Sequence, residues 1–270
     1  MTPQEYCKQK TKESHSSFLT ALYAFCREVD DIADECLDHE IASRKLNWWR
    51  DEIERLFKDE PQHPVSKALH PFIGHFNLSK NYFIEIIDGM EMDVKFNRYE
   101  SFEQLKLYCY RVASCVGILS AHIFGYKNKN TLTFAKNLGI ALQLTNIIRD
   151  LGEDARRGRI YIPLDELKKI GISEEEIISL KNSEKIKNLV KNQVDRAKQF
   201  YALAINTLPI EDKKSQKIGL IMGNIYFVLL NEIVKDNPEK ILNQKTILPG
   251  FRKLRISILT MLGFSWIKKT

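Results

Sequence analysis

Two acidic clusters in the chain have the residue types and the spacing to bind a metal ion. In each cluster two aspartates stand four residues apart, Asp30 with Asp34 and Asp150 with Asp154. Residues at this spacing share one face of a helix, so each pair can direct two carboxylates to the same point. Like charges there destabilise an isolated helix, and a hard cation such as Mg²⁺ would compensate them. The spacing therefore predicts a metal site between two helices.

An arginine accompanies each cluster, Arg27 before the first and Arg149 before the second pair. Arginine forms bidentate contacts with phosphate oxygens, and Mg²⁺ bridges such oxygens to carboxylates. The predicted ligand is therefore a diphosphate, whose departure a bound metal would assist as a Lewis acid. The alternative is two solvated helix faces with surface ion pairs, each worth about 0–1 kcal/mol. The apolar residues around both clusters favour the metal site.

The elements that carry these clusters have helical period almost throughout. Apolar residues recur at helical spacing in residues 18–36, 41–57, 81–94, 101–124, 131–153, 183–206 and 213–234. Only residues 159–163 look extended. Residues 105–124 and 134–148 are apolar or small nearly all round, which is typical of centrally buried helices. We expect an all-α fold in which these small residues allow close packing or leave room for a ligand.

The composition indicates one globular domain spanning residues 1–270. Of its 270 residues 44% are hydrophobic and 28% charged, and no linker rich in Pro, Gly or Ser divides them. The net charge of +6 suits an anionic substrate or membrane surface and is too diffuse to favour nucleic acid. Five cysteines without metal spacing, and no apolar signal segment, indicate a reducing compartment. No run of 18 apolar residues occurs, so we expect no spanning helix.

Residues 251–270 combine basic and apolar side chains. The basic residues are Arg252, Lys253, Arg255, Lys268 and Lys269, and no acid accompanies them. The mainly apolar run between them, residues 256–267, is too short to span a bilayer. Two interpretations stay open for this tail: an interfacial helix that contacts a membrane, or the last helix of the core.

Several stretches resemble the squalene/phytoene synthases, a family of head-to-head prenyltransferases. They cover most of residues 4–165 in family order: HSSF at 15–18, LYAFCREVDDIAD at 22–34, GMEMD at 89–93, YCYRVASCVG at 108–117 and QLTNIIRDLGEDARRGRIYIP at 143–163. The resemblance implies a class I isoprenoid synthase fold, a helical bundle around a central apolar cavity. Residues 89–125 look most like the bacterial presqualene diphosphate synthases of hopanoid biosynthesis. That likeness implies a bacterial cytoplasmic protein, either free or peripheral on the inner face of the membrane.

The resemblance also implies a reaction and its site residues. Two farnesyl diphosphates bind, one ionises, the double bond of the other attacks the allylic cation, and proton loss gives presqualene diphosphate. The implied metal ligands, for two or three Mg²⁺ ions with bound diphosphate, are Asp30, Asp34, Asn146, Asp150 and Asp154. The implied contacts of substrate and diphosphate are Tyr23, Arg27, Arg149, Arg159, Tyr161, Ser16, Ser17, Phe18, Tyr110, Gln143 and Asn146. A ring face of Tyr110 or Phe25 could stabilise positive charge, with core packing as the alternative.

Other members of the family remain as alternatives. They are a squalene synthase that needs NADPH, a dehydrosqualene synthase and a phytoene synthase. The chain has no Gly-x-Gly, and we expect no NADPH. A non-catalytic binding or assembly factor of the same fold is the alternative outside the enzymes. The expected partners are farnesyl diphosphate and downstream isoprenoid enzymes.

One departure from the family pattern falls between Phe18 and Leu19. Family members carry a further helical, aromatic-rich stretch there, beside the substrate entrance. Either the protein lacks this stretch, or the residues of a mobile flap are missing between Phe18 and Leu19. We expect the flap, which predicts a spatial gap between these two residues. A normal peptide bond would contradict this expectation.

Overall fold

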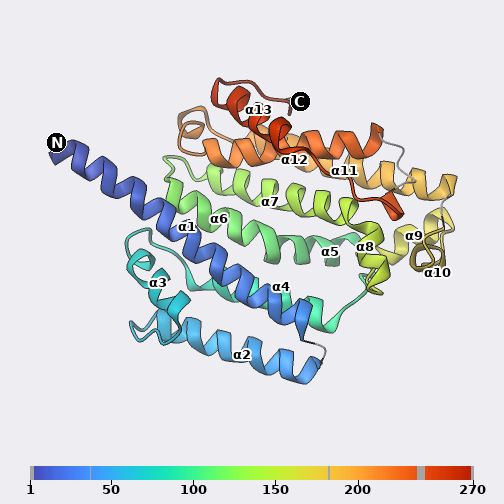
Figure 1. Ribbon diagram of the computed structural model, residues 1–270, viewed down its shortest axis with the longest axis horizontal. Coiled ribbons are helices and arrows are strands. Elements are labelled where there is room, and N and C mark those ends of the chain that lie inside the picture. Colours follow the sequence, from blue (N-terminus) through green and yellow to red (C-terminus); the bar gives the residue numbers. More distant parts are fainter. Residues whose placement is uncertain (1–2, 37, 182, 236–240, 269–270) are drawn as a thin grey trace.

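The computed structural model describes residues 3–36, 38–181, 183–235 and 241–268, with side chains from residue 17 onward. This described part is helical, without strands, as the sequence predicts (Figure 1). The extended piece at residues 159–163 makes one parallel bridge, between Ile160 and Arg98. The helices are α1 (Pro3–Glu35), α2 (His39–Leu56), α3 (Pro64–Ile73), α4 (Lys80–Lys95), α5 (Phe102–Cys109), η1 (Tyr110–Ser114), α6 (Cys115–Phe124), α7 (Asn130–Arg149), α8 (Leu151–Arg156), α9 (Leu164–Ile170), α10 (Glu174–Ile178), α11 (Glu184–Thr207), η2 (Ile210–Asp212), α12 (Lys217–Lys235) and α13 (Gly250–Met261).

Helix α1 runs without a break through Phe18 and Leu19. The predicted gap is therefore wrong, and so is the mobile flap. The physical reason lies in the packing of the helix: Phe18 is fully buried, and its ring meets those of Phe72 and Phe76 edge-on at centroid distances of 5.5 and 6.1 Å. The N-terminal part of α1 projects beyond the rest of the bundle (Figure 1).

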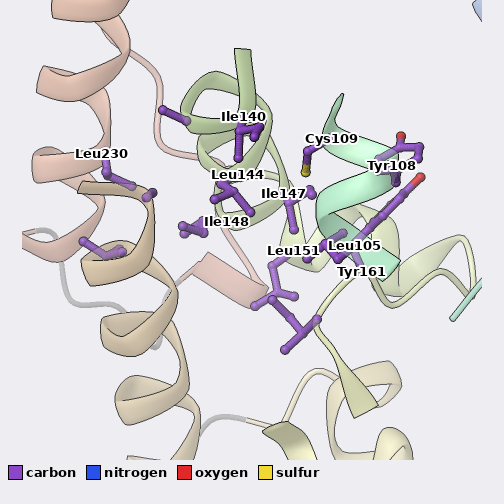
Figure 2. Packing of buried hydrophobic residues seen from close by; sticks show 14 of the residues in the cluster. Leu105, Tyr108, Cys109, Ile140, Leu144, Ile147, Ile148, Leu151, Tyr161 and Leu230 are labelled. Atoms are coloured by element: carbon purple, nitrogen blue, oxygen red, sulfur yellow. The ribbon is translucent and has the colours of Figure 1, made fainter. Parts of the chain in front are cut away.

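Two large apolar clusters form the core, and α7 is central to one of them. This cluster joins α7 to α5, α11 and α12, and Figure 2 shows part of it, including Leu144, Ile147 and Leu230. The other joins α1, α2, α3, α4 and α6. Helix α2 of this second cluster illustrates how the sequence determines where a helix begins and which of its faces is buried. The Asp38 carboxylate accepts hydrogen bonds from two backbone N–H groups of the first turn, and the apolar face behind it is buried.

The small residues of the central helices serve close packing. A Cβ atom added to Gly139 of α7 would lie 2.6 Å from the Cα of Ser114. Ser114 belongs to η1, a single π-helical turn inside the otherwise α-helical stretch 102–124. Such turns often occur near functional sites, and they shift the phase of the residues that follow.

Two helices of the described chain are long and apolar enough to cross a membrane by length and composition, Phe102–Phe124 and Lys217–Lys235. Of their most apolar windows, 44% and 28% respectively are buried in the fold. A core helix of a soluble protein passes the same test, so the expected absence of a spanning helix stays a prediction.

Candidate functional site

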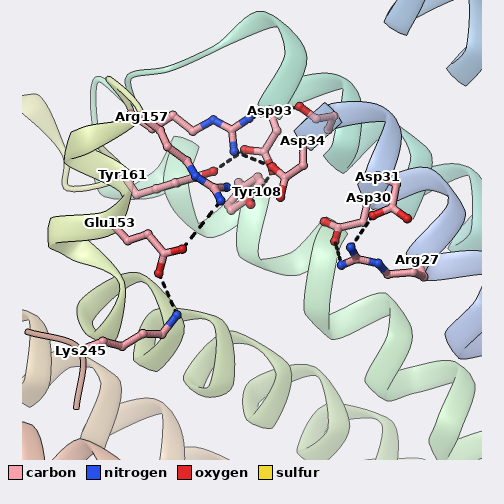
Figure 3. A network of polar contacts seen from close by, with 12 residues as sticks. Arg27, Asp30, Asp31, Asp34, Asp93, Tyr108, Glu153, Arg157, Tyr161 and Lys245 are labelled. Carbon is pink, nitrogen blue, oxygen red and sulfur yellow. Dashed lines mark hydrogen bonds and ion pairs between the residues drawn. The ribbon is translucent and has the colours of Figure 1, made fainter. Parts of the chain in front are cut away.

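The first acidic cluster lies in the last turns of α1. Arg27 pairs with Asp31 at 2.6 Å and with Asp30 at 3.4 Å, as Figure 3 shows. Burial raises the pKa of Asp30, and the neighbouring Asp34 carboxylate raises it further. The two predicted metal ligands of α1 are therefore close enough to repel each other, which is the property that a cation would relieve.

The second cluster spans the junction of α7 and α8. The sequence predicts one helix through residues 131–153, but the backbone of Asp150 (φ −98°, ψ 7°) ends α7 there. The Asp154 N–H still donates to the Asp150 carbonyl at 2.8 Å, so the two side chains stay one turn apart. Burial, and then the charge of Asp150, raise the pKa of Asp154 to about 7.

Asp150 itself is held by two cations. Arg149 Nε donates to Asp150 Oδ1 at 2.8 Å, and Lys245 Nζ lies 2.9 Å from the same oxygen. Burial alone would raise the pKa of Asp150, but these two partners outweigh it and lower that pKa. Lys245 also contacts Glu153 at 2.9 Å.

Arg159 joins the two clusters. Its Nη1 donates to Asp34 Oδ1 at 2.8 Å, and its Nη2 donates to the Ala33 carbonyl at 3.2 Å. Burial raises the pKa values of Asp30 and Asp154, and the Arg159 charge opposes both upward shifts. A single guanidinium therefore acts on carboxylates of both clusters, which places the clusters in one electrostatic site.

Asp93 on α4 is a site residue that the sequence reasoning missed. It accepts hydrogen bonds from the hydroxyls of Tyr108 and Tyr161, each at 2.7 Å (Figure 3). Burial raises the pKa of Asp93 to about 6, although both tyrosines and Arg159 oppose the shift. The signal in the sequence was an acid between two apolar residues, Met92 and Val94, inside the GMEMD stretch.

Lys245 was missed because a tertiary contact brings it to the site. The segment before it crosses α8 so closely that a Cβ atom on Gly152 would lie 2.1 Å from the Leu242 carbonyl oxygen. Only glycine fits at position 152, inside the second acidic cluster. Gly152 therefore allows the segment from Ile241 to approach and to deliver Lys245 to Asp150.

A cavity of about 220 Å³ lies beside Asp30, where the two apolar clusters meet. Its lining residues are Tyr23, Cys26, Arg27, Asp30, Ile86, Met90, Tyr108, Val112 and Gln143. Four of these, Tyr23, Arg27, Asp30 and Gln143, are site residues expected from the sequence. Tyr23 is 70% exposed, so the cavity opens toward solvent beside it. The cavity is therefore open to solvent and lined by both polar and apolar side chains, and the central apolar cavity expected from the resemblance stays a prediction.

A second cavity, of about 280 Å³, lies on the other side of Asp34. Arg157, Arg159 and Lys95 contribute its positive charge, and Asp34 and Asp93 contribute its negative charge. Asp34 and Arg159 thus face a polar space as well as each other.

The remaining expected residues fall outside these cavities. Phe18 lies in the core, so its expected contact with substrate is not supported. Phe25 is also a core residue, between Trp49 and Phe83. The ring of Tyr110 faces the Lys136 ammonium at 5.5 Å, and Tyr108 lines the cavity in its place. Ser17 is exposed, and the side chain of Ser16 lies outside the described part of the chain.

The oxygen atoms of the site fit a hard cation that is coordinated by the protein and by a diphosphate together. Asn146 donates from Nδ2 to Gln143 Oε1 at 3.3 Å, while its Oδ1 is buried with no hydrogen-bond partner in the described chain. Such an orphan acceptor suits a metal ion. No three His, Cys, Asp or Glu side chains of the described residues gather into a complete metal site. An ion here would need oxygens from phosphate and water, as Mg²⁺ commonly does.

Comparison with known proteins gives consistent matches. A sequence model of the squalene/phytoene synthases matches residues 13–252. The phytoene synthase of Arthrospira platensis is 33% identical over 277 residues, covering 93% of this chain and 89% of that protein. Chloroplastic phytoene synthase 1 of Arabidopsis thaliana is 40% identical over 187 residues, covering 67% of this chain; the chain spans only 44% of that relative.

Solved structures share the fold. Squalene synthase HpnC from Alicyclobacillus acidocaldarius superposes with a TM-score of 0.72 at 26% identity, covering 87% of this chain and 94% of that one. A dehydrosqualene synthase superposes with a TM-score of 0.81 at 24% identity, covering 96% of this chain and 95% of that one. The class I isoprenoid synthase architecture expected from the sequence is confirmed.

Proposed function

The chain belongs to the squalene/phytoene synthase family of prenyltransferase-type enzymes, and on that premise we propose that it joins two farnesyl diphosphates head to head. The proposed product is presqualene diphosphate, with release of one diphosphate. The observation that carries the proposal is the position of Arg159, bonded to Asp34 and acting electrostatically on Asp154. A departing diphosphate needs cations and metal-binding carboxylates at one point, and this arginine joins the two carboxylate pairs there.

The metal ligands in this proposal are Asp30, Asp34, Asn146, Asp150 and Asp154. Bound Mg²⁺ would supply the charge that stabilises the leaving diphosphate. The chain's own cations then orient that group: Arg27, Arg149 and Arg159 already lie against these carboxylates and can each present a guanidinium fork to phosphate oxygens.

The cavity beside Asp30 would take a prenyl chain. Ile86, Met90 and Val112 give it an apolar wall, which limits the access of water to a carbocation. Tyr108 lines the same cavity and is fixed through its hydroxyl by Asp93, so its ring is held in one orientation. A ring held in this way can stabilise positive charge in the cavity.

The choice of product rests on two sets of similarity. The likeness of residues 89–125 to presqualene diphosphate synthases, with the structural match to HpnC, supports farnesyl diphosphate as substrate. The phytoene synthases of Arthrospira platensis and Arabidopsis thaliana support a second candidate, a phytoene synthase acting on geranylgeranyl diphosphate. Both candidates use the same site.

Substrate competition separates the candidates. Purified protein is incubated with Mg²⁺ and equal farnesyl and geranylgeranyl diphosphate, with and without NADPH, and the lipids are identified by mass spectrometry. We expect a cyclopropylcarbinyl diphosphate of 30 carbons that needs no reductant. A 40-carbon product would favour the second candidate, and squalene formed only with NADPH would favour a squalene synthase. No turnover would favour the non-catalytic alternative.

A further inference from the structure

Helix α13 turns apolar side chains toward solvent along one side. Its inner side packs Ile256 against Val228 and Leu229 of α12. Its outer side and the residues just after it expose six apolar side chains by 49–73%: Phe251, Leu254, Ile258, Met261, Leu262 and Phe264. We call these six residues the α13 face. Several exposed apolar side chains gathered on one side of a helix commonly mark an interaction surface.

The charged residues of the segment that carries the α13 face are all basic. Residues 241–270 contain no Asp or Glu. Lys245 and Arg252 pair with acids from other segments, namely Asp150 and Glu232. Lys253, Arg255 and Lys268 are exposed at the surface beside the apolar side chains. This arrangement is complementary to a surface that is apolar inside and negatively charged outside.

The neighbouring helix α12 extends the apolar surface. Ile218 and Met222 are exposed by 50% and 40%, and Lys217 of the same turn donates to the Met261 carbonyl of α13 at 3.0 Å. Only 28% of the most apolar window of α12 is buried in the fold. The two helices lie next to each other on the side of the bundle opposite α2 (Figure 1).

We propose that the α13 face docks on an anionic lipid bilayer, with α13 lying along its surface. The apolar side chains would leave water for the headgroup–acyl boundary, and Lys253, Arg255 and Lys268 would meet lipid phosphates. At 12 residues α13 is too short to cross a bilayer, so the protein lies on the membrane by this contact.

Docking in this way would bring a cavity to the membrane. A cavity of about 470 Å³ lies between α12 and the chain before α13, and Met222, Ile247 and Lys253 belong to its lining. Arg149 and Lys245, the two cations on Asp150, line it as well. On the proposed function, this position would let a prenyl diphosphate reach the site from the bilayer; the docking itself does not depend on that function.

Vesicle flotation without substrate tests the docking separately from the catalytic proposal. The vesicles are phosphatidylcholine with or without phosphatidylglycerol. We expect wild type to float with the anionic vesicles and F251Q/L254Q to bind them at least about tenfold more weakly. The matched control I41Q/W48Q, an aliphatic and an aromatic residue of α2 exposed by 41% and 43%, keeps wild-type binding. K253E/R255E and added salt both weaken binding, because the lipid phosphates attract the basic residues.

Three results would overturn the proposal, once circular dichroism shows that each variant is folded. The first is that wild type fails to float with anionic vesicles. The second is that F251Q/L254Q floats as well as wild type. The third result is that wild type forms a dimer without lipid and does not bind vesicles, while F251Q/L254Q is monomeric. The α13 face would then bind a second copy of the chain.

Discussion

Arg159 donates a hydrogen bond from Nη1 to Asp34 Oδ1 at 2.8 Å across 125 residues of chain. Arg159 follows the second acidic cluster and Asp34 belongs to the first, so this bond joins the two motifs. The positive charge of Arg159 reduces the repulsion between the carboxylates of the two clusters.

Replacing Arg159 by alanine should lower kcat/KM for prenyl transfer by about 100-fold, the size expected for a lost group that stabilises developing negative charge. Steady-state kinetics with farnesyl diphosphate measure it. Arg252→Ala is the control, since Arg252 also pairs with a carboxylate, Glu232, but outside the acidic clusters. Equal effects of the two substitutions would contradict a role for Arg159 in the site.

Asp154→Asn should raise the free energy of unfolding of the metal-free protein by about 1–2 kcal/mol at pH 8, after allowance for partial exposure. The folded-state pKa of Asp154 is raised to about 7 from an ordinary 3.8, so ionising this side chain costs more in the folded state. This cost is complete above pH 7 and disappears below pH 3.8. Urea denaturation should therefore show the advantage of the variant shrinking as pH falls from 8 toward 4; a constant difference would refute it.

Gly152→Ala should displace the segment that carries Lys245. The new Cβ atom would overlap the Leu242 carbonyl oxygen, which is backbone and cannot turn aside. We expect a loss of about 1–3 kcal/mol in unfolding free energy and weaker diphosphate binding. Gly74→Ala is a helix-end control, because a Cβ atom there meets nothing within 4 Å. Equal stability of the two variants would mean that the segment adapts.

Asp93→Ala should cost about 2–4 kcal/mol of stability, because it leaves the buried hydroxyls of Tyr108 and Tyr161 without their acceptor. Asp93→Asn keeps one carbonyl oxygen and should lose less. Thermal unfolding of both variants checks this order. A reversed order would show that the charge of Asp93, rather than its acceptor oxygens, matters to the fold.

The fold could be predicted because helical period is a local property. Residues 41–57 and 183–206 were expected as helices and correspond to α2 and α11 within a few residues. The break at Asp150 and the π-turn at Tyr110 could not be predicted, since both depend on how the chain packs around them. The resemblance indicated Tyr110 as a cavity residue, whereas the structure places Tyr108 in the cavity lining.

The site could be predicted only where one motif supplied several groups. The paired aspartates and their arginines lie close in sequence, so spacing was enough to suggest them. Asp93 and Lys245 come from other segments, and only tertiary contacts show their part. The family pattern misled at Phe18, where apolar contacts with Phe72 and Phe76 support an unbroken helix.

The central claim is that the two acidic clusters form one metal-dependent diphosphate site. Isothermal titration of inorganic diphosphate in the presence of Mg²⁺, on wild type, Asp34→Ala and Asp150→Ala, tests it directly. We predict that wild type binds in a manner that requires Mg²⁺ and that each substitution, made in a different cluster, weakens binding at least about tenfold in a folded protein. Wild-type affinity in either variant would contradict the claim.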